Sequence, residues 1–212
     1  MKRKLALFDF DDTMIKGDSI ATLVRQFVKQ GHMSLPYLMK TLWATLQWKR
    51  GKVPVEVAKS MSLSPLNKMG QEQVEQYCKA FVKDHLVPNL YQDAVDKMKA
   101  HHEAGDLVLL VSASPYVYLQ HLKDALPVDD ILATQSNQAH LVTLNVVRED
   151  KNRQIKAWLN ARGIEADWEA SSAYGDSAND LPMLGMVGKP HLVNPKPKTR
   201  ELGKGIPVLH WK

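Results

Sequence analysis

Three carboxylates crowd together near the start of the chain, at the end of an apolar run. The apolar run 5–10 is interrupted by Asp9 and is followed directly by Asp11 and Asp12. Thr13 then adds a hydroxyl. Like charges at one strand end are costly to bury unless another group compensates them. A hard cation such as Mg²⁺ suits clustered carboxylates because it prefers oxygen ligands. The pattern favours a site for a metal ion and a phosphate, provided that other parts of the chain supply the remaining groups.

Two further polar clusters also follow apolar runs. Ser112 and Ser114 come after the aliphatic residues 107–111, and the second cluster comes after residues 171–174. The members of the second cluster are Asp176, Asn179 and Asp180. In open α/β sheets the carboxyl ends of the strands form the ligand crevice. We therefore expect all three clusters to meet at one edge of a sheet, a coincidence that core packing alone does not explain.

Several of these residues also have a local explanation. Asp176 and Asp180 could cap the helix that follows them, and Ser114, just before Pro115, is expected to cap a helix. The other residues with a local alternative are turn residues: Asp12, Ser112 and Asn179. For Asn179 the alternative is contact with a metal-bound water.

The spacing of apolar residues predicts two regions of different architecture. Residues 16–88 show helical periodicity at 20–31, 36–51, 55–61 and 71–85, with no strand signal. After residue 88, strands at 107–111, 131–134, 141–147, 171–174, 191–193 and 208–209 alternate with helical segments. Such alternation predicts a parallel sheet with right-handed crossovers. The expected fold class is α/β, a Rossmann-like core formed by residues 1–15 and 89–212, with an inserted all-helical cap domain at 16–88.

Composition limits the class of protein. The 212 residues are 44% hydrophobic and 24% charged, as in ordinary globular proteins. Cys78 is the single cysteine, which excludes an internal disulfide framework and fits a reducing compartment. No apolar stretch approaches the length of a membrane span, and the apolar run after the basic N-terminus is too short for a signal peptide. We expect a cytoplasmic protein.

The excess positive charge lies in the predicted helical segment. Residues 16–88 hold eleven Lys and Arg against five Asp and Glu, a net charge of +6, and the remaining residues carry −1. Such a segment can attract an anionic substrate, an anionic membrane or nucleic acid, although a solvated surface is the simplest explanation. An aromatic and basic cluster near its middle could contact a membrane interface, or could be ordinary packing with a wet basic end: Trp43, Trp48, Lys49, Arg50 and Lys52. We expect no nucleic-acid partner.

The motifs resemble those of the haloacid dehalogenase (HAD) superfamily over nearly the whole chain. Residues 9–13, Asp-Phe-Asp-Asp-Thr, are similar to its first motif, and Ser112 after an aliphatic run is similar to its second. Lys151 is similar to the third, and residues 175–180, Gly-Asp-Ser-Ala-Asn-Asp, to the fourth. A helical insertion between the first two motifs is similar to the cap of the subfamily that contains phosphoserine phosphatase. The sequences at residues 111–115 and 193–195 resemble more closely those of another branch of the superfamily, which includes phosphatases that act on lipid phosphates.

The resemblance implies a role for each motif residue. Asp9 would be the nucleophile that forms an aspartyl-phosphate, and Asp11 would be the general acid and base, with a raised pKa. Mg²⁺ would be held by Asp9, the main-chain carbonyl of Asp11, and Asp176. Phosphate would be bound by three further residues: Thr13, Ser112 and Lys151. Supporting roles would fall to Asn179 and to Asp180, which would orient the metal shell or pair with Lys151. Lys156 is the alternative site lysine, but it lies in the middle of its predicted helix.

These residues predict a Mg²⁺-dependent phosphatase that acts on a phosphate monoester of a small metabolite or a lipid. Two alternatives remain: phosphoryl transfer to another acceptor, as in a mutase, and a non-catalytic phosphate-binding protein. The pairing of Asp9 with Asp11 argues against the last, because phosphate binding alone needs no leaving-group acid. A monomer or a homodimer is expected.

Overall fold

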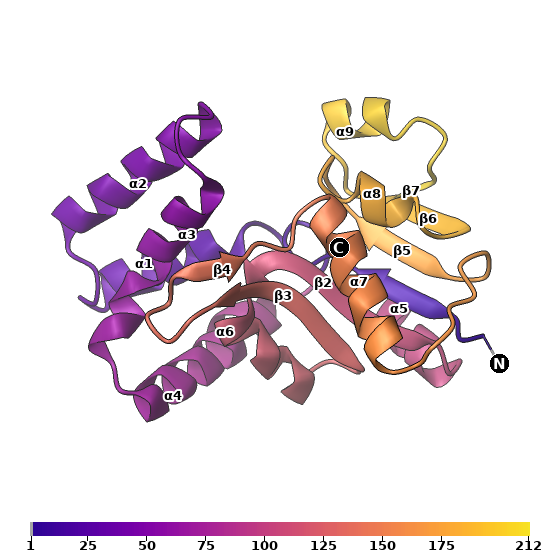
Figure 1. Cartoon of the computed structure of the whole chain (residues 1–212), viewed down its shortest axis with the longest axis horizontal. Helices are drawn as coiled ribbons and strands as arrows, with labels where there is room; N and C mark the ends of the chain where they lie inside the picture. Colours follow the sequence, from indigo (N-terminus) through magenta and orange to yellow (C-terminus); the bar gives the residue numbers. More distant parts are fainter. Residues whose placement is uncertain (1) are drawn as a thin grey trace.

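The computed structural model describes residues 2–212 and contains one seven-stranded sheet (Figure 1). Its strands are β1 (Leu5–Phe8), β2 (Leu107–Pro115), β3 (Asp130–Ser136), β4 (Val142–Leu144), β5 (Ser172–Gly175), β6 (Lys189–Val193) and β7 (Val208–Leu209). Their order is β4-β3-β2-β1-β5-β6-β7, and every pairing is parallel except that of β4 with β3. The expected α/β fold with a mainly parallel, Rossmann-like sheet is confirmed.

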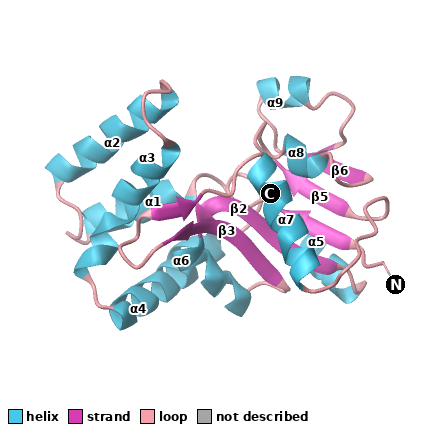
Figure 2. Ribbon diagram, in the orientation of Figure 1, coloured by secondary structure: helices cyan, strands magenta, loops and turns pink. Residues whose placement is uncertain are grey.

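Helices lie around the sheet (Figure 2), and at least one helix separates each pair of consecutive strands except β3 and β4. The helices are α1 (Ser19–Lys29), α2 (Leu35–Lys49), α3 (Val55–Leu63), α4 (Gln71–Phe81), α5 (Gln92–Glu103), α6 (Tyr116–Leu119), α7 (Glu149–Ala161), α8 (Leu181–Leu184) and α9 (Pro197–Leu202). The helix expected at 71–85 is instead α4 followed by a π-helical turn, Val82–Leu86. A short 3₁₀ helix, Val87–Asn89, then leads into α5.

The central strand β1 is buried on both sides, as its uniformly apolar sequence predicts. Leu5 and Leu7 belong to a cluster that includes residues of α7 and α8. Ala6 and Phe8 belong to a second cluster with residues of α5 and α6. Because both faces of β1 are enclosed, the residues that follow it are held rigidly at the carboxyl edge of the sheet.

Residues 16–88 form helices joined by turns and contain no strand, as their periodicity predicts. This segment does not form a separate apolar core: Phe27, Leu66 and Phe81 belong to the same cluster as Phe8 and Phe10. The segment therefore packs against one face of the sheet through a continuous core. The division into a core domain and a cap domain at residues 16 and 88 stays a prediction.

The outermost helix of this segment is α2, at the upper left of Figure 1. It is 15 residues long. Within residues 2–212, no helix combines the length and the apolar character that crossing a bilayer requires. Cys78, on α4, is a free thiol in the core, as expected.

Candidate active site

The three polar clusters meet at the carboxyl ends of β1, β2 and β5, which are neighbours in the sheet. They line one cavity of about 550 Å³. The predicted site residues that line it are Asp9, Asp11, Ser112, Lys151, Asp176, Asn179 and Asp180. Thr13 is fully buried beneath it and contacts Asp9. The prediction that strand ends would converge on one crevice is therefore correct.

Lys151 is the central cation of the site. Its side chain is 1% exposed, and its Nζ lies 2.5 Å from Asp9 Oδ1 and 2.6 Å from Asp180 Oδ1. Thr13 Oγ1 donates a hydrogen bond of 3.1 Å to Asp9 Oδ2, so both carboxylate oxygens of Asp9 are occupied. The two carboxylates raise the pKa of Lys151 above its ordinary value despite burial, which opposes this. Lys156, the alternative, is exposed on the same helix.

Asp180 is held by the turn that precedes α8. Its Oδ2 accepts hydrogen bonds from Ser177 N at 3.0 Å and Ser177 Oγ at 2.7 Å. Gly175 lies against it: a Cβ at that position would be 2.5 Å from Asp180 Cβ. Glycine is therefore required at position 175, because any larger side chain would clash with Asp180. Asp180 makes no side-chain cap hydrogen bond to α8, so the capping alternative is wrong for this residue.

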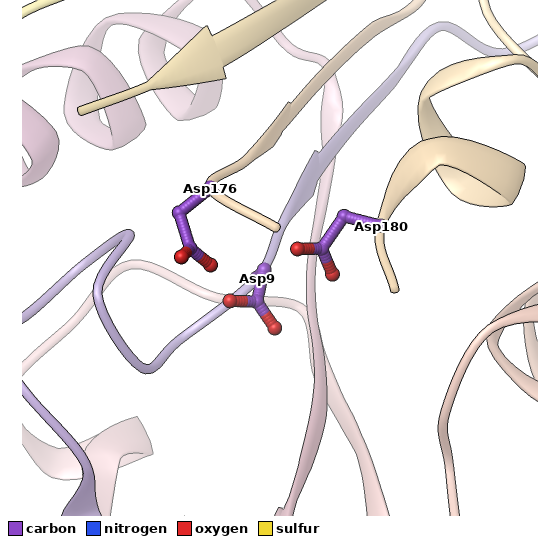
Figure 3. A group of neighbouring side chains, drawn as sticks. All are labelled: Asp9, Asp176 and Asp180. Atoms are coloured by element: carbon purple, nitrogen blue, oxygen red, sulfur yellow. The ribbon is translucent and has the colours of Figure 1, made fainter. Parts of the chain in front are cut away.

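Three carboxylates form a group that could hold a metal ion (Figure 3). One oxygen from each of Asp9, Asp176 and Asp180 lies within 4.8 Å of the others, and all three residues are buried. Burial, together with the charges of Asp180 and Asp12, raises the pKa of Asp176 to about 7. Within residues 2–212 the Asp176 side chain has no hydrogen bond or ion pair. A buried, unpaired carboxylate beside two others is what a hard divalent cation would compensate, so the residues fit Mg²⁺.

The acidic group contains two of the expected metal ligands, Asp9 and Asp176. Asp11 was expected to act through its main-chain carbonyl, and that part stays a prediction. Asp180, expected to orient the metal shell or pair with Lys151, supplies the third carboxylate of the group. Asp180 follows a turn after β5, and that turn folds back over Asp9.

Asp11 has its own hydrogen-bond network. Its Oδ1 accepts from Ser19 N at 2.7 Å, and its Oδ2 accepts from Ser114 Oγ. Ser19 Oγ lies 2.9 Å from Ser114 Oγ and 2.8 Å from the hydroxyl of Tyr118, so a buried hydroxyl chain supports the carboxyl. Burial, with a contribution from the charge of Asp18, raises the pKa of Asp11 to about 6. The raised pKa agrees with the expected general acid.

Ser114 was expected to cap a helix, and this expectation is wrong. Helix α6 has no side-chain cap, and the Ser114 hydroxyl is directed to Asp11 instead. Strand β2 extends past its aliphatic part to Pro115, which carries Ser112 and Ser114 into the site. Ser112 is buried, and its Oγ accepts a hydrogen bond of 3.0 Å from Ser114 N.

Asp12 and Asn179 lie at turns, as the local explanations propose. Asp12 has a positive φ of 55°, and its Oδ1 accepts from Gly17 N at 2.8 Å, which closes the loop after β1. Asn179 Oδ1 accepts a hydrogen bond of 3.0 Å from Arg148 Nε. That bond joins the turn after β5 to the residue that precedes α7.

The sequence analysis missed Lys59, which reaches the cavity from α3. Its Nζ donates to the carbonyl oxygen of Ala113 and to Asn145 Oδ1, both at 2.5 Å. Burial lowers the pKa of Lys59 to about 8, although the charge of Asp11 opposes this. The signal in the sequence was a single lysine in a short helix, with no spacing that links it to the motifs.

Comparisons with known proteins agree with this geometry. The family model for haloacid dehalogenase-like hydrolases matches residues 6–185. A protein of Streptomyces azureus named inhibition of morphological differentiation protein is 27% identical over 100% of this chain and 79% of its own length. A protein of Neisseria meningitidis named histidinol-phosphatase is 24% identical over 99% of this chain and 100% of its own.

Solved structures show the same fold. A protein of unknown function from Bordetella pertussis superposes with a TM-score of 0.87 at 28% identity, over 99% of both chains. A substrate-bound phosphoserine phosphatase superposes with a TM-score of 0.66 at 22% identity, over 98% of this chain and 93% of that one. With the family match over most of the chain, these similarities show that the chain belongs to the haloacid dehalogenase-like hydrolases.

Proposed function

We propose that the chain hydrolyses a phosphate monoester in two steps, through a phosphoryl group carried on Asp9, with Mg²⁺ as its cofactor. The observation that supports this most is the buried arrangement of Asp9, Lys151 and Asp180 beside Asp176 and Asp11. Such a cluster is expensive to bury for stability alone. Perturbed carboxylates in a cavity indicate a catalytic site.

In the first step, a carboxylate oxygen of Asp9 forms a bond to phosphorus while the ester P–O bond breaks. The departing alkoxide takes the proton of Asp11, whose raised pKa allows part of the population to be protonated near neutral pH. Lys151 stabilises the charge on the phosphoryl oxygens, and the hydroxyl of Ser112 lines the same pocket and can donate to them. Thr13, buried beneath the pocket, donates to Asp9 in this structure, and its contact with phosphate stays a prediction.

In the second step, Asp11 is ionised and accepts a proton from a water molecule. The water oxygen bonds to phosphorus, and the bond between phosphorus and the Asp9 oxygen breaks. Inorganic phosphate leaves and both aspartates return to their starting protonation states. The hydroxyl chain through Ser19 and Ser114 keeps the Asp11 carboxyl in one position through both proton transfers.

Mg²⁺, when bound, would neutralise charge between the incoming phosphate and the carboxylate nucleophile. Asp9 and Asp176 would hold it, with the main-chain carbonyl of Asp11, and Asp180 would either ligate it or hold Lys151 in place. These carboxylates supply the oxygen donors that this ion prefers.

Basic side chains other than Lys151 also line the cavity, which supports a small anionic phosphate ester as substrate. Lys59, Arg148 and Lys196 all line it. Lys59 is the best placed of the three, because it is partly buried and its two hydrogen-bond acceptors fix its direction. A phosphate ester of a lipid headgroup has the same chemistry and is included in the proposal.

The test is hydrolysis of p-nitrophenyl phosphate in the presence of Mg²⁺ by Asp9→Asn. We expect this variant to be inactive and folded, and acid-quenched wild type to carry a phosphoryl group on Asp9 by mass spectrometry. Asp12→Asn is the matched control on the same loop: asparagine tolerates the left-handed backbone of Asp12, so activity should remain. Retained activity in Asp9→Asn contradicts the proposed nucleophile.

The same assay separates hydrolysis from phosphoryl transfer. With an added alcohol acceptor, a hydrolase releases inorganic phosphate, whereas a mutase-type enzyme forms a new ester. We also propose a cytoplasmic location, which the single buried thiol supports. The expected monomer or homodimer stays a prediction that light scattering decides.

A further inference from the structure

Helix α2 exposes apolar side chains on its outer side. Nine large hydrophobic side chains are exposed among residues 2–212, and seven of them lie between residues 35 and 57. Six of these belong to α2: Trp48 is 40% exposed, and the other five are 43–67% exposed, namely Leu35, Met39, Leu42, Trp43 and Leu46. We call these five residues the α2 apolar face. Exposed apolar side chains scattered singly are normal, but a contiguous group of this size marks an interaction surface.

The buried side of α2 makes this face more unusual. The helix buries Thr41, Ala44 and Gln47, and two of these three side chains are polar. At about 100° per residue, the centre of the apolar face lies on the opposite side of the helix from these residues. Helices that pack on a protein core normally place their apolar side inward. Trp43, for which the sequence analysis considered ordinary packing, is instead 63% exposed.

The surroundings of the face are cationic. Residues 19–55 contain no Asp or Glu and six basic residues: Arg25, Lys29, Lys40, Lys49, Arg50 and Lys52. All six are exposed, and within residues 2–212 none of them forms an ion pair. Two apolar grooves of about 590 and 760 Å³ flank the helix and share Leu42.

We propose that the α2 apolar face binds the surface of an anionic lipid bilayer. Apolar and tryptophan side chains on one side of a helix with lysine and arginine around them are the pattern of helices that lie in a membrane interface. Tryptophan suits the headgroup region because its ring is apolar and its N–H is polar. Helix α2 has 15 residues and is about 22 Å long, shorter than the roughly 30 Å of a bilayer core, so it lies on the surface rather than across it.

A second copy of the chain fits the face less well. In a symmetric dimer the same patch meets itself, so Lys40, Lys49 and their basic neighbours would confront the same cations of the partner. Like charges placed opposite one another disfavour association. An anionic lipid bilayer offers an apolar layer for the exposed leucines and Trp43 and negative charge for the basic residues around them.

The first experiment is co-sedimentation of the full chain with vesicles of phosphatidylcholine, with and without about 30% phosphatidylserine, at low ionic strength. We expect binding to the anionic vesicles and a loss of binding at about 0.5 M salt, where surface charges are screened. Absence of binding to the anionic vesicles overturns the proposal. Equal binding to neutral vesicles overturns its electrostatic part.

Variants locate the surface. Leu42→Ser with Trp43→Ser should weaken binding at least tenfold, whereas Leu141→Ser with Leu202→Ser, which are 53% and 56% exposed elsewhere, should not. Lys49→Gln with Lys52→Gln should weaken it about 30-fold, since each cation near an anionic surface contributes about fivefold. Lys198→Gln with Lys204→Gln is the charge-matched control. Equal effects of test and control pairs overturn the assignment to α2.

Light scattering decides whether another copy covers the face. We expect the Leu42→Ser, Trp43→Ser protein to have the same mass in solution as the wild type. A dimer that dissociates only in this variant assigns the face to a second copy and overturns the proposal. These measurements read binding and mass, so they do not depend on the proposed phosphatase mechanism.

Discussion

Replacing Lys151 by methionine tests whether this side chain holds the acidic cluster together. The lysine is 1% exposed and forms ion pairs of 2.5 and 2.6 Å with Asp9 and Asp180. Removal of one partner from a buried ion pair costs about 3–5 kcal/mol of folding free energy, because the other charge is left unpaired. In a chain of this size each kcal/mol corresponds to about 2–4 °C, so the melting temperature should fall by roughly 6–20 °C.

The same change should reduce catalysis. Lys151 would stabilise the charge that develops on the phosphoryl oxygens, and loss of one such group lowers kcat by about 100- to 1000-fold. The assays are thermal unfolding followed by circular dichroism without metal, and p-nitrophenyl phosphate hydrolysis with Mg²⁺ below the melting temperature of the variant.

Lys156→Met is the matched control, because Lys156 is exposed on the same helix. Its unfolding free energy should stay within about 0.5 kcal/mol of wild type, and its activity should be unchanged. Adding Asp180→Asn to Lys151→Met should restore part of the lost stability, since one unpaired carboxylate is removed. A Lys151→Met protein that melts within about 2 °C of wild type and keeps its activity refutes the reasoning.

Three further predictions concern the substrate, the metal and the backbone. Because burial lowers the pKa of Lys59 to about 8, its positive charge is lost as the pH rises through that value, and KM for an anionic ester should rise there. Lys59→Arg should abolish this rise, and Lys59→Met should raise KM below pH 8, where the lysine of the wild type is charged, with the two KM values converging above it; a wild-type KM that is flat across pH 8 argues against a substrate contact. Chelation with EDTA should stop hydrolysis and Mg²⁺ should restore it, with Asp176→Asn requiring more Mg²⁺ for half-maximal activity; an unchanged Mg²⁺ titration excludes Asp176 as a ligand. Gly175→Ala should displace Asp180 and lower activity, whereas Gly70→Ala, where the nearest atom to a Cβ is 3.8 Å away, should not; equal activities would show that the turn adjusts.

The positions of the strands along the chain and the residues at their ends could be predicted from local pattern. The aliphatic run before Ser112 and the apolar run before Asp9 indicate buried parallel strands, and parallel strands bring their carboxyl ends to one edge. The prediction of Lys151 over Lys156 rested on position within a helix, and the structure places Lys151 in the cavity. These features depend on periodicity and chain direction, and both can be recognised in short stretches of sequence.

The side-chain contacts across the site could not be predicted in the same way. Ser114 was assigned to a helix cap because it precedes Pro115, yet its hydroxyl is directed to Asp11, 103 residues away. Lys59 meets Asn145 across 86 residues. Such contacts depend on how the helical segment packs on the sheet, and no local spacing records that packing.

The sequence by itself determined the strand ends that bear the acidic and hydroxyl groups, because a continuous apolar run marks a strand buried on both faces and the polar residues after it mark its end. Only the tertiary structure decided which side-chain carboxylates lie together, with Asp180 beside Asp9 and Asp176. Only the tertiary structure showed that α2 turns its leucines and Trp43 outward. The physical reason is that a helical apolar stripe has the same period whether a protein core, a partner or a bilayer covers it.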